Sequence, residues 1–294
     1  MIQSLTNDLL TVDIASHGAE LQNIVNNRTQ YRYLWQGDKA FWGRRSPVLF
    51  PIVGSVWGGR FLMDGNVYPM SQHGFARDRD FKPVSDAPDG EAWFVLESDD
   101  DTLAVYPRRF RLEIGYSLHE ARIGVMWRVT NLDRCPMHFQ IGAHPAFNYP
   151  DFSAGDSVHG YFCFDSAGPL VSEVIDRNGC VGSETVSVDT DADGLLPVTA
   201  STFSRDALIF GSHQVHRVSM LDKNRAPYLT LLFQAPLVGL WSPSSDAPFA
   251  CIEPWWGRCD RVGFEGDFSQ REYVNTLAPG DTFSASYMII IDNV

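Results

Sequence analysis

The chain has 294 residues, of which 44% are hydrophobic and 20% charged, a composition typical of a compact soluble protein with a large core. Its formal net charge of −13 argues against nucleic acid as a partner, because proteins that bind phosphates normally show a basic patch. No stretch approaches the ~18 uninterrupted apolar residues of a membrane-spanning helix. Five cysteines without disulfide-framework spacing, and a start without a secretory signal, favour the cytoplasm.

Short strand signals dominate the sequence from beginning to end. Residues 9–14 alternate apolar and polar side chains, a turn follows, and residues 19–24 alternate again. A Met-Asp-Gly-Asn sequence at 63–66 has the residues of a tight turn between two strand-like runs. The other predicted strands are rich in β-branched or aromatic residues and bounded by turn residues; they cover 92–97, 110–118, 122–131, 208–210, 217–221, 228–233 and 282–291.

The order of these elements predicts an all-β fold. We find no amphipathic helix longer than about two or three turns, and the βαβ alternation of a parallel sheet is missing. Residues 176–193 are polar and rich in Gly and Asp, and we interpret them as a long loop or an excursion from the fold. The composition does not change on either side of this loop, and no internal repeat is found. We therefore predict a large antiparallel β-sandwich that forms one domain over residues 1–294.

Two segments in the first third of the chain concentrate residues suited to chemistry. Residues 42–54 place two arginines, Arg44 and Arg45, beside a tryptophan and ahead of an apolar run; a solvated arginine pair before an edge strand is the alternative. Residues 72–77 set His73 next to a glycine and close to an arginine. Glycine at this point indicates a close approach of the backbone, although a lone His-Gly pair is weak.

Two later segments add an imidazole and a carboxylate. The proline that follows His144 restricts it to an extended backbone and fixes the direction of its side chain. A histidine satisfied within the core is the alternative. Glu253 follows an apolar stretch and precedes Trp255, and it is either a buried functional acid or the partner of Arg258. An aromatic face beside an acid is a common way to hold a sugar ring.

Several familiar chemistries are excluded by the sequence. The chain has neither a G-x-S-x-G elbow nor a G-x-x-x-x-G-K-[ST] loop. The glycine-rich run at 54–59 lacks the G-x-G-x-x-G pattern of dinucleotide binding. His213 and His216 are three residues apart, but no cysteine or carboxylate spacing completes a zinc site. We expect neither a metal nor a nucleotide cofactor.

Taken together, four motifs resemble those of the aldose 1-epimerase (mutarotase) family. The patterns are W-x-R-x-x-P-x-L-F-P-x-x-G at residues 42–54, Q-H-G-F-A-R at 72–77, H-P-x-F at 144–147 and E-P-W-x-G at 253–257. The similarity runs from residue 9 to the C-terminus, and four motifs in this order are far more specific than any one of them. The resemblance implies the β-sandwich of galactose-mutarotase-like proteins, with a sugar bound in a cleft across one sheet.

The resemblance also implies roles for individual residues. Glu253 matches the general base that takes the anomeric hydroxyl proton, and His144 matches the general acid that protonates the ring oxygen. His73 matches a histidine that hydrogen bonds near these atoms, with Gln72 and Trp255 as further contacts to the sugar. Opening a hemiacetal does require one base and one acid, each contributing about 10²–10⁴-fold, and no cofactor.

Other binding residues follow less directly from the resemblance. Asp206 lies in a segment, 203–208, that resembles the one supplying an aspartate to sugar hydroxyls in the galactose branch; a turn aspartate before a strand is the alternative. That branch also has a sugar-contacting arginine, which the matching stretch 53–61 lacks at that place. Arg77 and Arg45 are the candidates to replace it, and galactose is not assumed as the substrate.

Three functions remain as alternatives at this point. The first is a mutarotase acting on a free aldose. The second is a hexose-6-phosphate mutarotase, in which Arg44, Arg45 and Arg77 form a phosphate clamp. The third is a non-catalytic sugar-binding protein on the same scaffold, since a fold alone does not fix a function. The presence of both a histidine acid and a glutamate base favours catalysis over binding alone.

Overall fold

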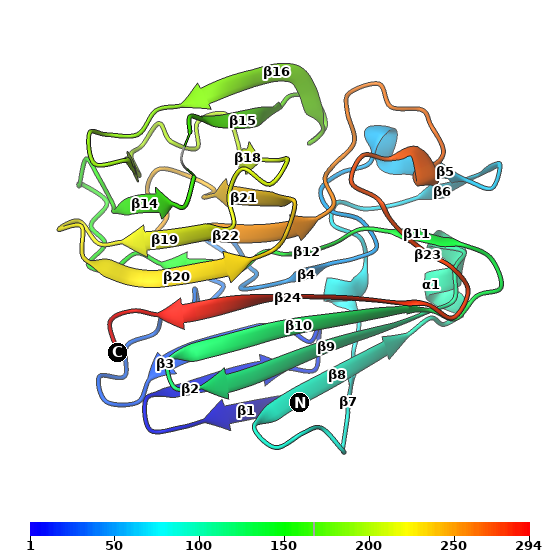
Figure 1. The fold of residues 1–294 in the computed structure, drawn as a ribbon, viewed down its shortest axis with the longest axis horizontal. Helices are drawn as coiled ribbons and strands as arrows, with labels where there is room; N and C mark the ends of the chain where they lie inside the picture. The colour runs from blue at the N-terminus through cyan, green and yellow to red at the C-terminus, as the bar shows by residue number, and fades with distance from the viewer. Residues whose placement is uncertain (167) are drawn as a thin grey trace.

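The computed structural model describes residues 1–166 and 168–294, and its largest element is a nine-stranded antiparallel sheet. The strands of this sheet are β7 (Lys82–Pro83), β8 (Glu91–Glu97), β9 (Phe110–His119), β10 (Arg122–Asn131), β14 (Tyr161–Phe164), β17 (Leu195–Pro197), β19 (Arg217–Leu221), β20 (Pro227–Phe233) and β24 (Thr282–Ile291). Their order is β17-β14-β19-β20-β24-β10-β9-β8-β7, with the longest strands at the centre (Figure 1).

The second large sheet has eight strands and carries the residues of the four motifs. Its strands are β4 (Val48–Leu49), β12 (Ile141–Ala143), β13 (Ala146–Asn148), β15 (Leu170–Ile175), β16 (Val181–Val188), β18 (Leu208–Phe210), β21 (Leu237–Trp241) and β22 (Phe249–Trp256). The order is β16-β15-β18-β21-β22-β12-β4, and β13 also pairs with β22. Two short strands therefore follow one another along one side of β22, and the break between them falls at His144 and Pro145.

Smaller elements complete the fold. They are the sheet of β1 (Ile2–Thr6), β2 (Leu10–Ala15) and β3 (Leu21–Asn26), the pairs β5 (Arg60–Met63) with β6 (Asn66–Pro69) and β11 (Met137–Phe139) with β23 (Asn275–Leu277), helix α1 (Asp100–Val105), and the 3-10 turns η1 (Trp57–Gly59), η2 (Ala76–Asp78) and η3 (Phe268–Gln270). No described helix has the length and apolar character needed to cross a lipid bilayer.

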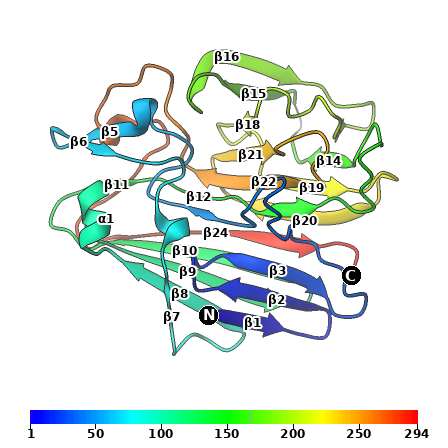
Figure 2. The same ribbon diagram turned by 180° about the vertical axis from the view of Figure 1, so that it is seen from behind.

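The two large sheets pack face to face through aromatic side chains. Trp127 on β10 meets Trp256 on β22 with ring centroids 5.5 Å apart, and Phe164 on β14 meets Phe210 on β18 at 5.5 Å. Every second residue of β22 enters this core; Ile252, for example, is fully buried in it. The predicted antiparallel β-sandwich is therefore confirmed, and Figure 2 shows the same layers from behind.

The strands predicted from the sequence are all present, with ends that shift by one or two residues. The predicted hairpin turn is also confirmed, because it joins β5 to β6. Its two central residues, Asp64 and Gly65, have φ values of 51° and 76°. Positive φ at both positions matches the twist of the flanking strands, which explains the Asp-Gly pair.

The prediction of a long loop or excursion over residues 176–193 is wrong for its central part. Its residues 181–188 form strand β16, which pairs with β15 after a turn at Asn178 and Gly179. Because β16 lies at the edge of its sheet and is largely exposed, it contains many polar residues. An exposed edge strand has the same composition as a loop, so the sequence pattern did not separate the two.

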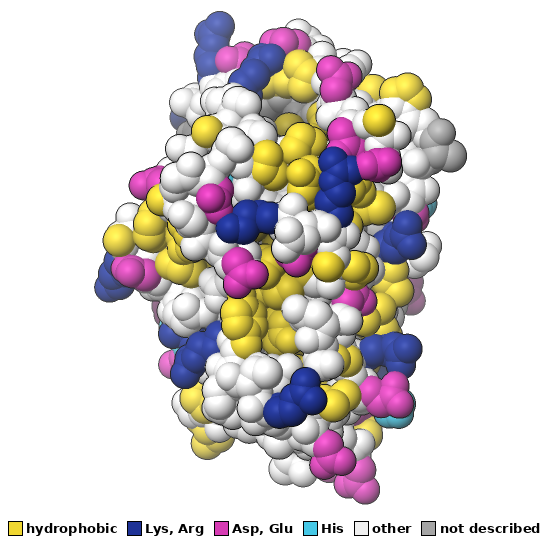
Figure 3. Space-filling view, turned by 90° about the vertical axis from the view of Figure 1, so that its left-hand side faces the viewer, with side chains coloured by type: hydrophobic (Ala, Val, Ile, Leu, Met, Phe, Trp, Pro, Cys, Tyr) yellow, Lys and Arg dark blue, Asp and Glu magenta, His cyan; other side chains and the backbone are white. Residues whose placement is uncertain are grey.

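Charged side chains of both signs are mixed on the surface. Figure 3 shows one face of the molecule, where lysines and arginines lie among acidic side chains around a band of hydrophobic ones. Exposed ion pairs also occur on the molecule, such as Arg205 with Glu184 at 2.6 Å. This face therefore presents no concentrated basic patch of the kind that binds nucleic acid.

Candidate active site

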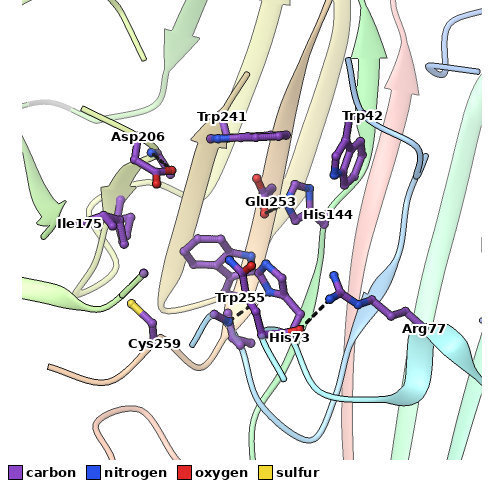
Figure 4. Close-up of a pocket in the computed structure, with 16 residues that line it drawn as sticks. Trp42, His73, Arg77, His144, Ile175, Asp206, Trp241, Glu253, Trp255 and Cys259 are labelled. Atoms are coloured by element: carbon purple, nitrogen blue, oxygen red, sulfur yellow. Dashed lines mark hydrogen bonds and ion pairs between the residues drawn. The ribbon is translucent and has the colours of Figure 1, made fainter. Parts of the chain in front are cut away.

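A cavity of about 210 Å³ opens on the face of the eight-stranded sheet that points away from the core. Its lining brings together segments far apart in the sequence, including His73, His144, Asp206 and Glu253. At ~30 Å³ per water, the volume equals that of about seven water molecules, which suits one sugar ring. Figure 4 shows Trp241 and Trp255 on two opposite sides of the site, with Asp206 and Arg77 on the other two.

Strand β22 supplies the floor of the cavity. Its residues alternate, so that Glu253 and Trp255 face the cavity while their neighbours enter the core. The large indole of Trp255 fits because the residues that its ring contacts on the two neighbouring strands include glycines. A Cβ at Gly239 on β21 would lie 2.5 Å from this ring, and one at Gly142 on β12 would lie 2.7 Å from it.

His144 and Glu253 form a close pair on this floor. His144 Nε2 lies 3.3 Å from Glu253 Oε2, and the two side chains are 9% and 1% exposed. The two atoms are not joined by a hydrogen bond, which leaves Glu253 Oε2 buried without a partner among the described residues; His144 Nδ1, on the other side of the ring, is also buried without one. Buried polar atoms normally have partners, and unpaired ones are expected where a ligand supplies them.

Burial drives both members of this pair towards their uncharged forms. Burial raises the pKa of Glu253 well above its usual value, and the nearby charge of Asp206 raises it further. Burial also lowers the pKa of His144 to about 3, and Arg77 adds to this effect. A neutral carboxyl and a neutral imidazole together carry one transferable proton. A pair with one proton is what a reaction with one acid and one base needs.

Two tryptophans hold the imidazole of His144 in place. Trp42 stacks on it with ring centroids 4.7 Å apart, and Trp241 meets it edge-on at 5.6 Å. The backbone contributes as well, because Pro145 follows His144 and its carbonyl accepts a hydrogen bond from Ile252 on β22. The ring is therefore fixed by packing rather than by a hydrogen bond to its Nδ1.

His73 is held in a strained turn directly beside His144. Its φ is 67°, and Gly74 follows with φ 71°, where a Cβ would lie 2.2 Å from the carbonyl oxygen of Phe50. The amide of Gly54 donates to His73 Nδ1 at 3.1 Å, so the ring proton resides on Nε2. Burial lowers the pKa of His73 well below its usual value, which keeps this ring neutral and makes Nε2 a hydrogen-bond donor.

Arg77 and Gln72 line the cavity beside His73. Arg77 Nη2 donates to the carbonyl of Gln72 at 2.7 Å, while its Nε is buried without a hydrogen-bond partner among the described residues. Burial lowers the pKa of Arg77 to about 10, so its guanidinium remains charged at neutral pH. Asp78 lies between Arg77 and Arg44, 3.8 Å from the first and 2.9 Å from the second.

Asp206 lines the cavity, and it also occupies the turn before β18 that the alternative interpretation gave it. Its φ is 72°, and its Oδ1 accepts a hydrogen bond from Ala207 N at 2.8 Å. Figure 4 shows its carboxylate on the side of the site opposite Arg77. Its position supplies an anionic acceptor facing a cationic donor across the cavity.

The structure separates Arg45 from the other site candidates. Its guanidinium donates to the carbonyl of Gln22 at 2.9 Å, and its backbone amide donates to Glu20. Arg45 is therefore anchored to β3 and does not line the cavity. The predicted clamp of three arginines is not assembled, because Arg77 alone of the three is among the described lining residues.

The alternative pairing of Glu253 with Arg258 is not found either. Arg258 is buried and forms ion pairs with Glu173 and Glu272. These bonds hold the loop after β22 against β15, at one side of the cavity. His213 and His216 hydrogen bond to each other at 3.3 Å, and neither lines the cavity.

Sequence reasoning missed several walls of the cavity. They are Trp42, Ile175, Gly179, Trp241 and Cys259. Trp42 belongs to the first motif but was not assigned a contact, and Trp241 ends a strand that the sequence did not predict. Ile175 and Gly179 come from the hairpin that resembled a loop. Recognising residues 170–188 as two strands would have placed this hairpin beside the site.

One cluster of side chains could hold a metal ion. The ligand atoms of His144, Cys251 and Glu253 all lie within 4.8 Å of one another, and all three residues are buried. Burial raises the pKa of Cys251 well above its usual value, which disfavours the thiolate that a metal requires. The cluster fits neutral acid–base groups better than a set of metal ligands.

Known proteins resemble the chain over its full length. The family described as aldose 1-epimerase matches residues 1–273. Protein LacX, chromosomal, from Lactococcus lactis subsp. lactis is 29% identical over 312 residues and covers 100% of both chains.

Two solved structures share the fold closely. A galactose mutarotase related enzyme from Lactobacillus acidophilus has a TM-score of 0.91 and 29% identity, with 100% of this chain and 98% of that chain covered. A galactose mutarotase-like protein from Lactobacillus casei ATCC 334 has a TM-score of 0.92 and 29% identity, with 99% and 100% covered.

Proposed function

Because this chain belongs to the aldose 1-epimerase family, we propose that it interconverts the α and β anomers of an aldose by opening and reclosing the sugar ring. One observation carries the proposal. His144 Nε2 and Glu253 Oε2 lie 3.3 Å apart, both buried, on the floor of a cavity that suits one sugar ring. Each side chain also has a buried polar atom without a partner in the described protein.

The reaction assigns one proton transfer to each member of the pair. Glu253, as the carboxylate, removes the proton from O1, and the C1–O5 bond breaks with its electron pair passing to O5. His144, as the imidazolium, gives O5 its proton. The result is the open-chain aldehyde with a neutral carboxyl and a neutral imidazole. Rotation about C1–C2 and the reverse transfers then close the other anomer.

The cavity favours the neutral forms of Glu253 and His144 that ring opening leaves behind. Burial disfavours both the Glu253 carboxylate and the His144 imidazolium. The two protons moved in ring opening neutralise both groups at once. Ring opening therefore returns Glu253 and His144 to the neutral forms that burial favours, and forming the ionised pair, by passing the one proton from Glu253 to His144, is part of the barrier.

The remaining walls supply the contacts that hold a sugar. His73 Nε2 and the Arg77 guanidinium are donors, and the Asp206 carboxylate is an acceptor on the opposite side. The indoles of Trp241 and Trp255 offer flat apolar surfaces to the C–H faces of the ring. Binding contacts thus surround the acid–base pair.

The charges around the cavity favour a neutral aldose over a sugar phosphate. Arg45 is bound to β3, and Arg44 is paired with Asp78. Asp206 faces the cavity with a negative charge that would repel a phosphate. The proposed substrate is therefore a free aldose.

The test is the rate of exchange between anomers, measured by polarimetry and by NMR across a panel of aldoses and their 6-phosphates. We expect acceleration with at least one free aldose, and a fall of about 10²–10⁴-fold in Glu253→Gln and in His144→Ala. Exposed residues of the same types provide the controls, namely Glu265→Gln and His119→Ala.

Each alternative has its own outcome in this test. Acceleration restricted to 6-phosphates would show that a phosphate is recognised. Sugar binding without acceleration of any aldose would identify a binding protein. A full rate in both Glu253→Gln and His144→Ala would refute the assignment of acid and base.

A further inference from the structure

A second cavity, of about 270 Å³, lies behind one wall of the active-site cavity. It is formed where β14 begins and where β17 and β21 end, and its lining includes His159, Thr199, Ser204 and Ser242. At ~30 Å³ per water, this volume equals that of about nine water molecules, again the size of a monosaccharide. None of the residues of the proposed reaction lines it.

His159 lines this cavity and has one hydrogen-bond acceptor without a partner among the described residues. The side chain is buried, and its Nε2 lies 3.0 Å from the carbonyl oxygen of Ser245. A carbonyl only accepts, so Nε2 carries the ring proton and Nδ1 is left with a lone pair. His159 Nδ1 is buried and has no hydrogen-bond partner among the described residues. A hydroxyl group is the kind of donor that would complete it.

The rest of the lining matches a neutral, polyhydroxylated molecule. Serine and threonine hydroxyls alternate with the apolar surfaces of Phe203 and Pro243, and Tyr149 lies next to His159 with ring centroids 5.6 Å apart. No aspartate, glutamate, lysine or arginine is among the described lining residues. An ionic ligand would therefore be buried without a counter-charge, which is unfavourable.

We propose that this second cavity binds a neutral cyclic polyol of monosaccharide size, with His159 Nδ1 accepting a hydrogen bond from one of its hydroxyls. The site is separate from the active site and does not depend on the proposed reaction. Its ligand is held by the His159 imidazole together with hydroxyl and aromatic contacts, and no carboxyl group is among the described lining residues to pair with that imidazole as Glu253 pairs with His144.

The two cavities share a wall. Ser204 lines the second cavity and Asp206 lines the first, although only one residue separates them in the same turn. Trp241 and Ser242 likewise line the first and the second cavity from adjacent positions at the end of β21. Each pair belongs to one short segment that presents residues to both sites.

The test uses amide NMR of the whole protein titrated with myo-inositol, a cyclic polyol that has no anomeric carbon. We expect saturable shifts of the amides of residues 198–204 and 242–247. The apparent Kd should rise about tenfold or more in His159→Phe, which removes the acceptor. Glu253→Gln, altered only in the first cavity, should leave the shifts unchanged.

A second variant covers the case in which His159→Phe does not fold. Ala200 is exposed at the rim of the second cavity, so Ala200→Trp should block entry, whereas Ala154→Trp places the same indole away from it. Titration with glucuronate should give binding at least tenfold weaker than with inositol. An absence of saturable shifts with inositol, equal affinity for glucuronate, or shifts unchanged by Ala200→Trp would overturn the proposal.

Discussion

The floor and the rim of the active-site cavity are built in different ways. On the floor, Glu253 and Trp255 lie on a strand that has neighbours on both sides, and they are almost completely buried. On the rim, Asp206 sits in an exposed turn, and Gly179 sits in the turn that leads to an edge strand. Proton transfer needs atoms held within tenths of an ångström in a dry setting, whereas recognition of hydroxyl groups tolerates variable loops.

The largest effect is expected from crowding the floor. In Gly239→Val, the new side chain would occupy the space of the Trp255 ring. We expect a loss of about 1–3 kcal/mol or more in unfolding free energy, together with loss of anomer exchange. Urea denaturation and the exchange rate measure the two. Gly155→Val, at a position with open space around it, should change neither; equal effects at both glycines would show that the floor is not specially packed.

The second test measures how strongly the floor disfavours charge. His144 has a folded pKa of about 3 against a usual value of 6.5, so the unfolded chain binds its proton more readily. This contribution to stability is complete above pH 6.5 and is lost as the pH falls towards 3. When the pH is lowered from 7 to 4.5, the unfolding free energy falls in both proteins. The fall should be about 2–3 kcal/mol smaller in His144→Gln than in the wild type.

Chemical denaturation at the two pH values gives this difference directly. His119→Gln, which alters an exposed histidine, is the control and should behave as the wild type. The raised pKa of Glu253 acts in the opposite sense, since its stabilising contribution is present at acid pH and lost as the pH rises. The Glu253 contribution is present in both the wild type and His144→Gln, so to first order it cancels when the two proteins are compared. An unchanged pH dependence in His144→Gln would show that this imidazole is solvated.

On the rim, substitution should alter binding far more than chemistry. Asp206→Asn removes the anionic acceptor, and we expect KM to rise about tenfold while kcat stays within about threefold. Because Asp206 raises the pKa of Glu253, the alkaline limb of the pH–rate profile should move to lower pH. Asp189→Asn is the exposed control. A fall of about a hundredfold in kcat would abolish the distinction between floor and rim.

The smallest effect is expected just outside the cavity. Arg45→Gln removes the hydrogen bond to Gln22 but no contact with the cavity. We expect about 1 kcal/mol of lost stability and kinetic constants within about twofold of the wild type. Arg77→Gln should raise KM by more than this, since Arg77 lines the cavity. Equal rises in KM for both variants would place Arg45 at the sugar.

The sequence predicted the sandwich well because its central strands alternate or carry β-branched residues. Strands β9, β10 and β24 were found almost to the residue. It missed β22 because every residue but the last is buried, which removes the alternation that identifies a strand. It also missed β16, where exposure on the edge gives the composition of a loop.

For the site, the motifs placed the floor, and the sequence indicated only a few residues around it, Asp206 and Arg77 among them. The motifs that contain His73, His144 and Glu253 have fixed local spacing, and the structure brings these three residues into one cavity. The positions of Arg45 and Trp241 depend on contacts between distant strands. Arg45 turns towards β3, and Trp241 reaches the cavity from the end of β21. Local sequence patterns carry no information on either arrangement.

The wall that presents Asp206 to one cavity and Ser204 to the other has a thermodynamic consequence. A ligand that moves this turn while binding on one side changes the affinity on the other side. Linkage requires the effect to be reciprocal, so that each ligand alters the dissociation constant of the other by the same factor. A polyol bound at His159 would then act as a modulator of sugar affinity, positive or negative according to which position of the turn it stabilises.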